Sequence, residues 1–246
     1  IFSLFKKNKK LLLFLLKNKT ITLEKDIVKQ FESDDDYNQF FKPEIDSKFD
    51  VNEEFERNRE HGENDSYLCT LIREDSVQNF IYYVNKMDLS LKSEINHSIF
   101  ETNSFLIKRK TTLIEYSAFY GSMQIFHYLK SKNVELEPTL WLYAIHGRNI
   151  ELLKILNENG IQFPDDKIER CIEESIKCHH NEITNYIQDN LGDDDLDDKE
   201  ISFNENITAY SFHYMNFLYM PTDFEFKFTF FYLCRYGFFD LVKLFI

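Results

Sequence analysis

In this chain of 246 residues, the stretch TLWLYAIHGRNIELLKILNENG, residues 139–160, carries a helix-turn-helix pattern. Two apolar segments with helical spacing flank the short sequence His146-Gly147-Arg148. Gly160 ends the stretch, and glycine commonly ends helices because it accepts the left-handed backbone conformation. The stretch therefore predicts a first helix, a tight turn and a second helix. An alternative interpretation, in which the histidine and arginine bind an anion or carry a proton, is less favoured.

The same arrangement recurs along the chain, first in TLIEYSAFYGSMQIFHYLKSKN, residues 112–133. Small or apolar residues stand three and four positions before each turn, and Gln, Glu or Asp stands three positions after it. The aligned turn positions are Gly121, Arg148, His179 and Gly237, at spacings of 27, 31 and 58 residues, the last being twice 29. Periods of 20–50 residues are typical of solenoids, in which neighbouring units bury one another's apolar faces. We therefore expect an all-α solenoid of helix-turn-helix repeats.

Two observations support the register of this alignment. Asn133 and Gly160 both stand at position thirteen of their units, counted from the turn residue, and both residue types tolerate the left-handed conformation. Ala118 stands where a first helix should pack closely against its neighbour. We therefore expect substitution of Ala118 by leucine to overpack the repeat.

Composition excludes some classes of function. The chain carries 42 acidic and 29 basic residues, a net charge of −13. This balance argues against nucleic acid as a partner, because phosphate binding needs a basic surface. Hydrophobic residues make up 43%, so most of the chain should fold. The four cysteines lack the spacing of a disulfide framework, which indicates a reduced, cytoplasmic protein.

The repeat pattern resembles the ankyrin repeat. Thr112 and Thr139 match its opening threonine. Gly121 and Gly237 match its turn glycine, and residues 237–246, GFFDLVKLFI, are close to its second helix. Four stretches more specifically resemble divergent ankyrin proteins that are expanded in parasitic protists and carry a domain of unknown function: REDSVQNFIYYVNK, SIFETNSFLIKRKTTLIEYSAFYGSMQIF, LWLYAIHGRNIELL and KCHHNEITNYIQ. The resemblance implies a helical fold and a protein-interaction role, with no established biochemical activity.

The pattern divides the chain into four segments. They are a helical N-terminal segment (1–65), divergent ankyrin-like repeats with a degenerate first unit (66–191), an acidic loop (192–202), and an aromatic-rich segment with the start of a further ankyrin repeat (203–246). Within the last segment we expect a helix over residues 229–236 and mostly irregular chain over residues 203–226. The usual Thr-Pro-Leu-His opening is largely lost, and the connections are too short for ankyrin β-hairpin fingers, so the binding mode of that family does not transfer directly.

First-helix positions beyond the core line the concave surface in ankyrin proteins. Counted from the opening threonine, positions five and eight of three successive units give a candidate protein-binding groove: Tyr116, Phe119, Tyr143, His146, Glu174 and Lys177. Tyrosine is enriched at interface hot spots, which favours binding. The alternative is burial of these side chains under neighbouring loops.

The stretch CIEESIKCHH is the strongest candidate for a metal site. Cys171 and Cys178 lie on one helical face, with His179 and His180 just beyond. Structural zinc sites usually contain ligand pairs only two to four residues apart, so we expect no metal, and helical circular dichroism that is unchanged in excess chelator. The chain also lacks a Gly-x-Ser-x-Gly elbow and a Gly-rich phosphate loop. We therefore expect no cofactor and no enzyme activity.

A protein-interaction scaffold or adaptor in the cytoplasm is the function that this pattern favours, with a protein partner of unknown identity. The alternative is a peripheral membrane-associated adaptor anchored through residues 1–20, where basic residues flank an apolar run. That run, residues 11–16, is far shorter than the roughly 20 residues that span a bilayer, so membrane insertion is not expected.

The two ends of the sequence suggest a piece of a longer repeat protein. The chain starts at Ile1 rather than methionine and stops inside the apolar sequence LVKLFI. A terminal repeat normally has a polar outer face, because nothing stacks beyond it. We therefore expect self-association through an uncapped C-terminal end.

Overall fold

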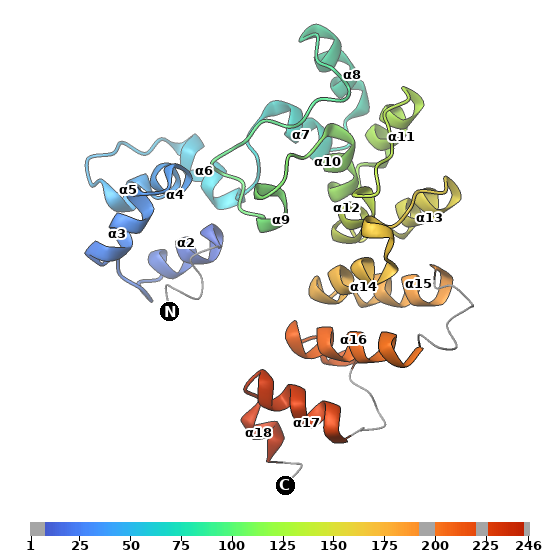
Figure 1. Cartoon of the computed structure of the whole chain (residues 1–246). Coiled ribbons are helices and arrows are strands. Elements are labelled where there is room, and N and C mark those ends of the chain that lie inside the picture. Colours follow the sequence, from blue (N-terminus) through green and yellow to red (C-terminus); the bar gives the residue numbers. More distant parts are fainter. Residues whose placement is uncertain (1–7, 192–199, 220–225, 244–246) are drawn as a thin grey trace. The chain divides into compact units, whose positions relative to one another are not determined.

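The computed structural model describes residues 8–191, 200–219 and 226–243, and these residues are helical with connecting turns (Figure 1). No strand forms within these ranges, where an isolated bridge pairs Glu94 with Thr112. The expectation of an all-α chain is therefore confirmed. The chain divides into two compact units, Ile1–Tyr116 and Ser117–Ile246, so the boundary expected at residue 65 falls inside the first unit.

The helices of the first unit are short, and polar side chains begin most of them. Their bounds are α2 Lys9–Lys17, α3 Lys25–Glu32, α4 Asp35–Phe40, α5 Lys42–Ile45, α6 Glu53–His61, α7 Tyr67–Arg73, α8 Val77–Lys86 and α9 Ser104–Ile107, while α10 Leu113–Tyr120 crosses into the second unit. The side chains of Asp34, Asn52 and Ser66 accept hydrogen bonds from backbone N–H groups at the starts of α4, α6 and α7. These bonds satisfy donors that the helices cannot satisfy themselves.

A phenylalanine-rich core lies beneath α2 to α5. It contains the buried residues Leu12, Leu13, Phe31, Phe40, Phe41 and Phe100. Arg59 of α6 is 1% exposed, and its guanidinium makes two hydrogen bonds to the carboxylate of Glu44, at 2.9 and 2.7 Å. Because a buried charge is costly without a partner, this bidentate pair fixes α6 against α5.

The second unit consists of successive helix pairs. The element bounds are α11 Met123–Ser131, α12 Leu140–His146, α13 Ile150–Glu158, η1 Pro164–Asp166, α14 Ile168–Lys177, α15 Asn181–Leu191, α16 Glu200–His213, η2 Phe217–Tyr219, α17 Phe226–Arg235 and α18 Phe239–Val242. The first helices of these pairs pack on one another in sequence order, α12 on α14, α14 on α16 and α16 on α17 (Figure 1). The second helix α13 packs on α15 in the same way.

One turn geometry joins consecutive helices at six positions, and the same geometry also ends helices at Lys19, Asp88, Asn133 and Gly160. In each case the turn residue has a positive φ, between 47° and 76°. The next residue donates its N–H to the carbonyl five positions before it, as in the bond from Asn149 N to Ala144 O at 3.2 Å. This is the Schellman arrangement that ends helices. The six turn residues are Asp75, Gly121, Arg148, His179, Met215 and Gly237. The four turn positions expected from the sequence are confirmed, as are the left-handed conformations of Asn133 and Gly160.

The aromatic-rich segment requires a correction. Residues 203–226 were expected to be mostly irregular, but residues 203–213 belong to α16 and residues 217–219 to η2. The acidic loop expected over residues 192–202 also overlaps α16, while its residues 192–199 lie outside the described ranges. The reason is the unequal repeat length, because the turn falls at Met215 rather than midway between His179 and Gly237. The helix expected over residues 229–236 is confirmed by α17.

Candidate functional site

The six residues expected to form a groove separate into two groups. Tyr116 and Tyr143 are 0% and 2% exposed, so their side chains belong to the packed interior, which was the alternative interpretation. The Tyr116 hydroxyl also accepts a hydrogen bond from Arg73 Nη1 at 3.0 Å. The other four lie toward the C-terminal ends of α10, α12 and α14, and they are Phe119, His146, Glu174 and Lys177. Of these, Glu174 is also buried, at 2% exposed.

These four side chains form a continuous series of contacts. The rings of Phe119 and His146 stack with centroids 5.5 Å apart and an angle of 24° between their planes. His146 Nε2 lies 2.9 Å from Glu174 Oε1, and Lys177 Nζ donates to the same oxygen at 2.7 Å. The repeat explains this convergence, because Phe119, His146 and Lys177 each stand two positions before a turn residue.

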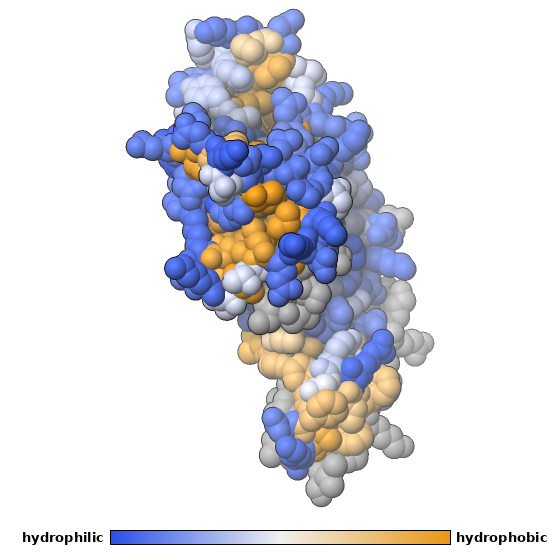
Figure 2. Space-filling model, turned by 90° about the vertical axis from the view of Figure 1, so that its left-hand side faces the viewer, coloured by the Kyte–Doolittle hydropathy of each residue, from blue (hydrophilic) through white to orange (hydrophobic). Residues whose placement is uncertain are grey.

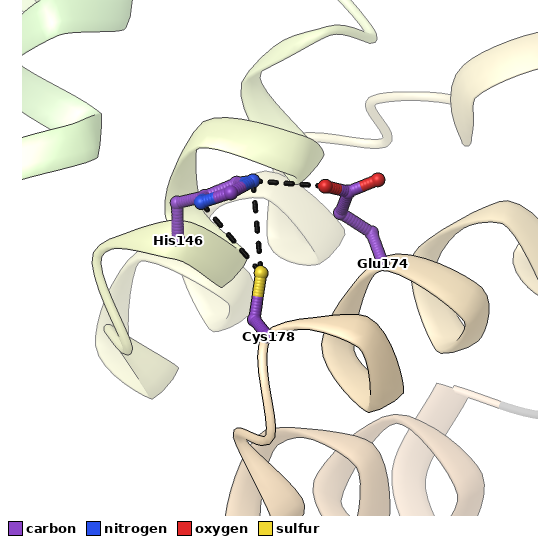
Figure 3. A group of neighbouring side chains, drawn as sticks. All are labelled: His146, Glu174 and Cys178. Atoms are coloured by element: carbon purple, nitrogen blue, oxygen red, sulfur yellow. Dashed lines mark hydrogen bonds and ion pairs between the residues drawn. The ribbon is translucent and has the colours of Figure 1, made fainter. Parts of the chain in front are cut away.

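Cys178 completes the group (Figure 3). Its sulfur lies 3.6 Å from Nδ1 and 3.7 Å from Nε2 of His146. Figure 3 shows His146 at the end of α12, with the sulfur of Cys178, which follows α14, below the imidazole ring and the carboxylate of Glu174, from α14, beside the ring. One nitrogen, one oxygen and one sulfur ligand atom therefore lie within 4.8 Å of one another.

Burial and charge set the protonation states of the two acidic groups. Burial alone would raise the pKa of Glu174, but its hydrogen bonds from His146 and Lys177 outweigh burial and lower the pKa to about 2. Burial raises the pKa of Cys178 to about 12, and the negative charge of Glu174 acts in the same direction. At neutral pH, Glu174 is therefore a carboxylate and Cys178 a protonated thiol, which is not an activated nucleophile.

Gly147 allows the end of α12 to approach α10. Its φ of −73° is ordinary for any residue. A Cβ atom built on Gly147 would lie only 2.5 Å from the Ala118 carbonyl oxygen and 2.9 Å from that of Phe119. The absence of a side chain at Gly147 therefore permits the close contact that stacks His146 on Phe119.

The four residues of the sequence-based metal candidate do not come together in the structure. Cys171 is fully buried, His179 Nε2 lies 3.0 Å from the Tyr214 carbonyl oxygen, and His180 Nδ1 lies 2.8 Å from the Ile145 carbonyl oxygen. Of the four candidates, Cys178 alone joins the group of ligand atoms found in the described part of the chain. Its partners His146 and Glu174 were assigned to the groove instead.

Comparisons with protein-family models, with curated proteins and with solved structures find no match for this chain. Among the helices described here, none is both long enough and apolar enough to cross a bilayer.

Proposed function

We propose that this chain is an ankyrin-like helical repeat protein that acts as a protein-interaction scaffold or adaptor in the cytoplasm, without a catalytic activity of its own. The observation that carries the proposal is the recurrence of one turn geometry between consecutive helices, once in the first unit and five times in the second, where the helices pack in sequence order. Units that stack in this way create an extended surface of repeated positions, which such proteins use to bind partners.

The proposed binding surface consists of Phe119, His146 and Lys177, which stand two positions before three successive turn residues. Phe119 and His146 are partly exposed, and the Lys177 side chain is 44% exposed. The surface thus offers an aromatic ring, an imidazole and a cation, a mixture suited to a protein partner. The net charge of −13 argues against nucleic acid.

Photo-crosslinking in the source cells tests this proposal. A photoreactive amino acid placed at Phe119 should join the chain to a discrete protein. The control is the same group at His127, which is exposed on the second helix α11. Equal crosslinking from both positions, or no discrete product from Phe119, would contradict the proposed surface.

A second candidate function is peripheral membrane binding through α2. The Phe14 side chain, 60% exposed, favours it, and the N-terminal helices that face the viewer in Figure 2 display a hydrophobic area. Leu12 and Leu13 of the same helix are buried in the core, however, and are not available to a membrane. Liposome flotation distinguishes the two functions: Phe14→Glu, which spares the core, should abolish flotation only if α2 is an anchor.

A further inference from the structure

Three potential metal ligands from two helices converge at the end of α12. Their nearest atoms are His146 Nε2, Glu174 Oε1 and Cys178 Sγ. His146 comes from one helix pair, and Glu174 and Cys178 from the next. Their positions are set by the packing of α12 on α14, so the three side chains are held together without a ligand.

The distances between these atoms suit a tetrahedral metal ion. Zinc binds imidazole nitrogen at about 2.0–2.1 Å, carboxylate oxygen at about 2.0–2.2 Å and thiolate sulfur at about 2.3 Å. Tetrahedral angles then separate nitrogen from sulfur by about 3.6 Å and nitrogen from oxygen by about 3.4 Å. The structure has 3.7 Å for the first separation and 2.9 Å for the second, and the sulfur is almost equally close, at 3.6 Å, to Nδ1. To admit the ion, the His146–Glu174 contact must widen and the imidazole must rotate so that Nε2 points between the oxygen and the sulfur.

We propose that His146, Glu174 and Cys178 form a binding site for a divalent transition metal, with zinc as the metal that fits best. One imidazole, one carboxylate and one thiolate are a donor set that zinc accepts, whereas magnesium and calcium prefer oxygen ligands alone. Because the Cys178 thiol is protonated in the free protein, zinc must displace its proton to solvent when the sulfur binds. Three protein ligands leave the fourth tetrahedral position for water or another donor. The proposal replaces the sequence-based expectation of no metal. It shares His146 with the proposed binding surface but does not rest on the proposed function.

The ammonium group of Lys177 competes with the metal. It donates to Glu174 Oε1, the same oxygen that would coordinate the ion. The positive charge of Lys177 repels a metal cation and occupies the oxygen that the metal needs, so Lys177 should weaken metal binding. Its replacement by methionine keeps much of the aliphatic stem and removes the charge. The site gains one net positive charge when Zn²⁺ replaces the thiol proton of Cys178. We therefore expect Lys177→Met to bind zinc roughly fivefold more tightly, the effect of one unit charge about 4 Å away in water.

Cobalt titration of the full chain tests the site directly. Protein stripped with chelator should take up one equivalent of Co²⁺ and show a sulfur-to-cobalt charge-transfer band. Cys178→Ser should abolish that band. Two matched controls should keep it: Cys234→Ser, which removes an exposed thiol, and His179→Gln, which removes the neighbouring imidazole. Zinc affinities of the wild type and of Lys177→Met follow from competition with a chromophoric chelator.

A second measurement needs no variant at the site. Zn²⁺ should slow the alkylation of Cys178 by N-ethylmaleimide in the wild-type chain and leave that of Cys234 unchanged, as followed by mass spectrometry. The absence of stoichiometric binding or of Cys178 protection would overturn the proposal. A charge-transfer band that survives Cys178→Ser in folded protein, or that disappears in either control, would also overturn it, as would unchanged or weaker zinc binding by Lys177→Met.

Discussion

Gly147 and Arg148 are neighbours in one turn, but only Arg148 has the backbone conformation that favours glycine, and only Gly147 lacks space for a side chain. Arg148 has a φ of 52°, a conformation that favours glycine. Gly147 has an ordinary φ, yet it contacts the carbonyl groups at the end of α10 too closely for a side chain. The glycine that looks like a turn residue in the sequence is therefore required for helix packing, while an arginine occupies the strained position.

This difference predicts two opposite effects on stability. Gly147→Ala should lower the free energy of unfolding by about 1–3 kcal/mol, because the new methyl group would overlap backbone atoms that cannot move alone. Arg148→Gly should be neutral or stabilising by up to about 1 kcal/mol, because it relieves strain and removes only an exposed ion pair with Glu182. Urea denaturation of both variants measures these effects. A destabilising Arg148→Gly together with a neutral Gly147→Ala would show that the two roles are reversed.

The lowered pKa of Glu174 predicts a pH-dependent contribution to stability. The folded pKa of about 2 lies below the ordinary 4.5, so the carboxylate stabilises the fold fully above pH 4.5 and loses this contribution as the pH falls toward 2. The lowering corresponds to an upper limit of roughly 3 kcal/mol. Glu174→Gln should therefore be less stable than the wild type at pH 7, and the difference should shrink between pH 4.5 and pH 2.

The exposed carboxylate of Glu182 provides the control for this prediction. Its side chain is 44% exposed and pairs with Arg148, so Glu182→Gln should change stability by less than about 1 kcal/mol. Denaturation curves collected across the same pH range compare the two variants. A stability difference for Glu174→Gln that does not change with pH would show that the charge of Glu174 contributes nothing.

Between elements, close packing relies at four of the six turns on a fully buried small residue four positions before the turn: Ser117, Ala144, Ser175 and Ser211. Ala118 of α10 is fully buried, and its carbonyl oxygen is the nearest neighbour of Gly147. Ala118→Leu should cost about 1–3 kcal/mol of stability by overpacking. The control is Ser131→Leu at the end of α11. Serine is similar in size to alanine, and position 131 is exposed, so the added leucine would face solvent. A melting temperature that Ala118→Leu leaves unchanged would mean that the repeat register is wrong.

Most of the helices and their turns could be predicted from the sequence, for a physical reason. Gly121, Gly237 and Gly160 mark left-handed positions that few other residues favour, and fully buried small residues precede the turns at Gly121, Arg148 and His179. The turn at Met215 could not be predicted, because methionine gives no signal for a positive φ. Ser211 and Phe212, four and three positions before Met215, are fully buried like the residues before the turns at Gly121, Arg148 and His179. The turn itself, however, does not fall midway between those at His179 and Gly237.

The candidate site was predictable only in part. Sequence periodicity placed Phe119, His146 and Lys177 at one repeat position. In the structure, Phe119 stacks on His146, and His146 and Lys177 both contact Glu174. Periodicity does not specify how far one helix is rotated against the next, so it did not show that Tyr116 and Tyr143 point inward. For the same reason it did not bring Cys178 to His146, which lies in the preceding unit.

At the scale of the whole molecule, the C-terminal elements present hydrophobic surface. Phe231 of α17 and Phe239 of α18 are 53% and 68% exposed. Figure 2 shows hydrophobic residues gathered at the lower end of the view, where Figure 1 places α17 and α18. Exposed patches of this kind commonly bind other surfaces. The final residues 244–246, on which the sequence-based expectation of a sticky end rested, lie outside the described ranges.

We predict that the chain self-associates through this surface at micromolar concentrations. Light scattering over a dilution series should give a mass that rises with concentration, and the double variant Phe231→Lys, Phe239→Lys should remain monomeric. Phe14→Lys, which places the same charge on the exposed position of α2, should associate like the wild type. A wild-type chain that remains monomeric at high concentration would rule out this interface.

We propose that one helix-turn-helix unit recurs along the chain, and the backbone conformation of its turn residues can be measured in solution. Three-bond HN–Hα couplings and Cα chemical shifts, measured by NMR on the labelled chain, report φ at each position. We predict a positive φ at all six turn residues: Asp75, Gly121, Arg148, His179, Met215 and Gly237. Ordinary negative φ values at Arg148, His179 and Met215, where no glycine makes the conformation easy, would contradict the repeat.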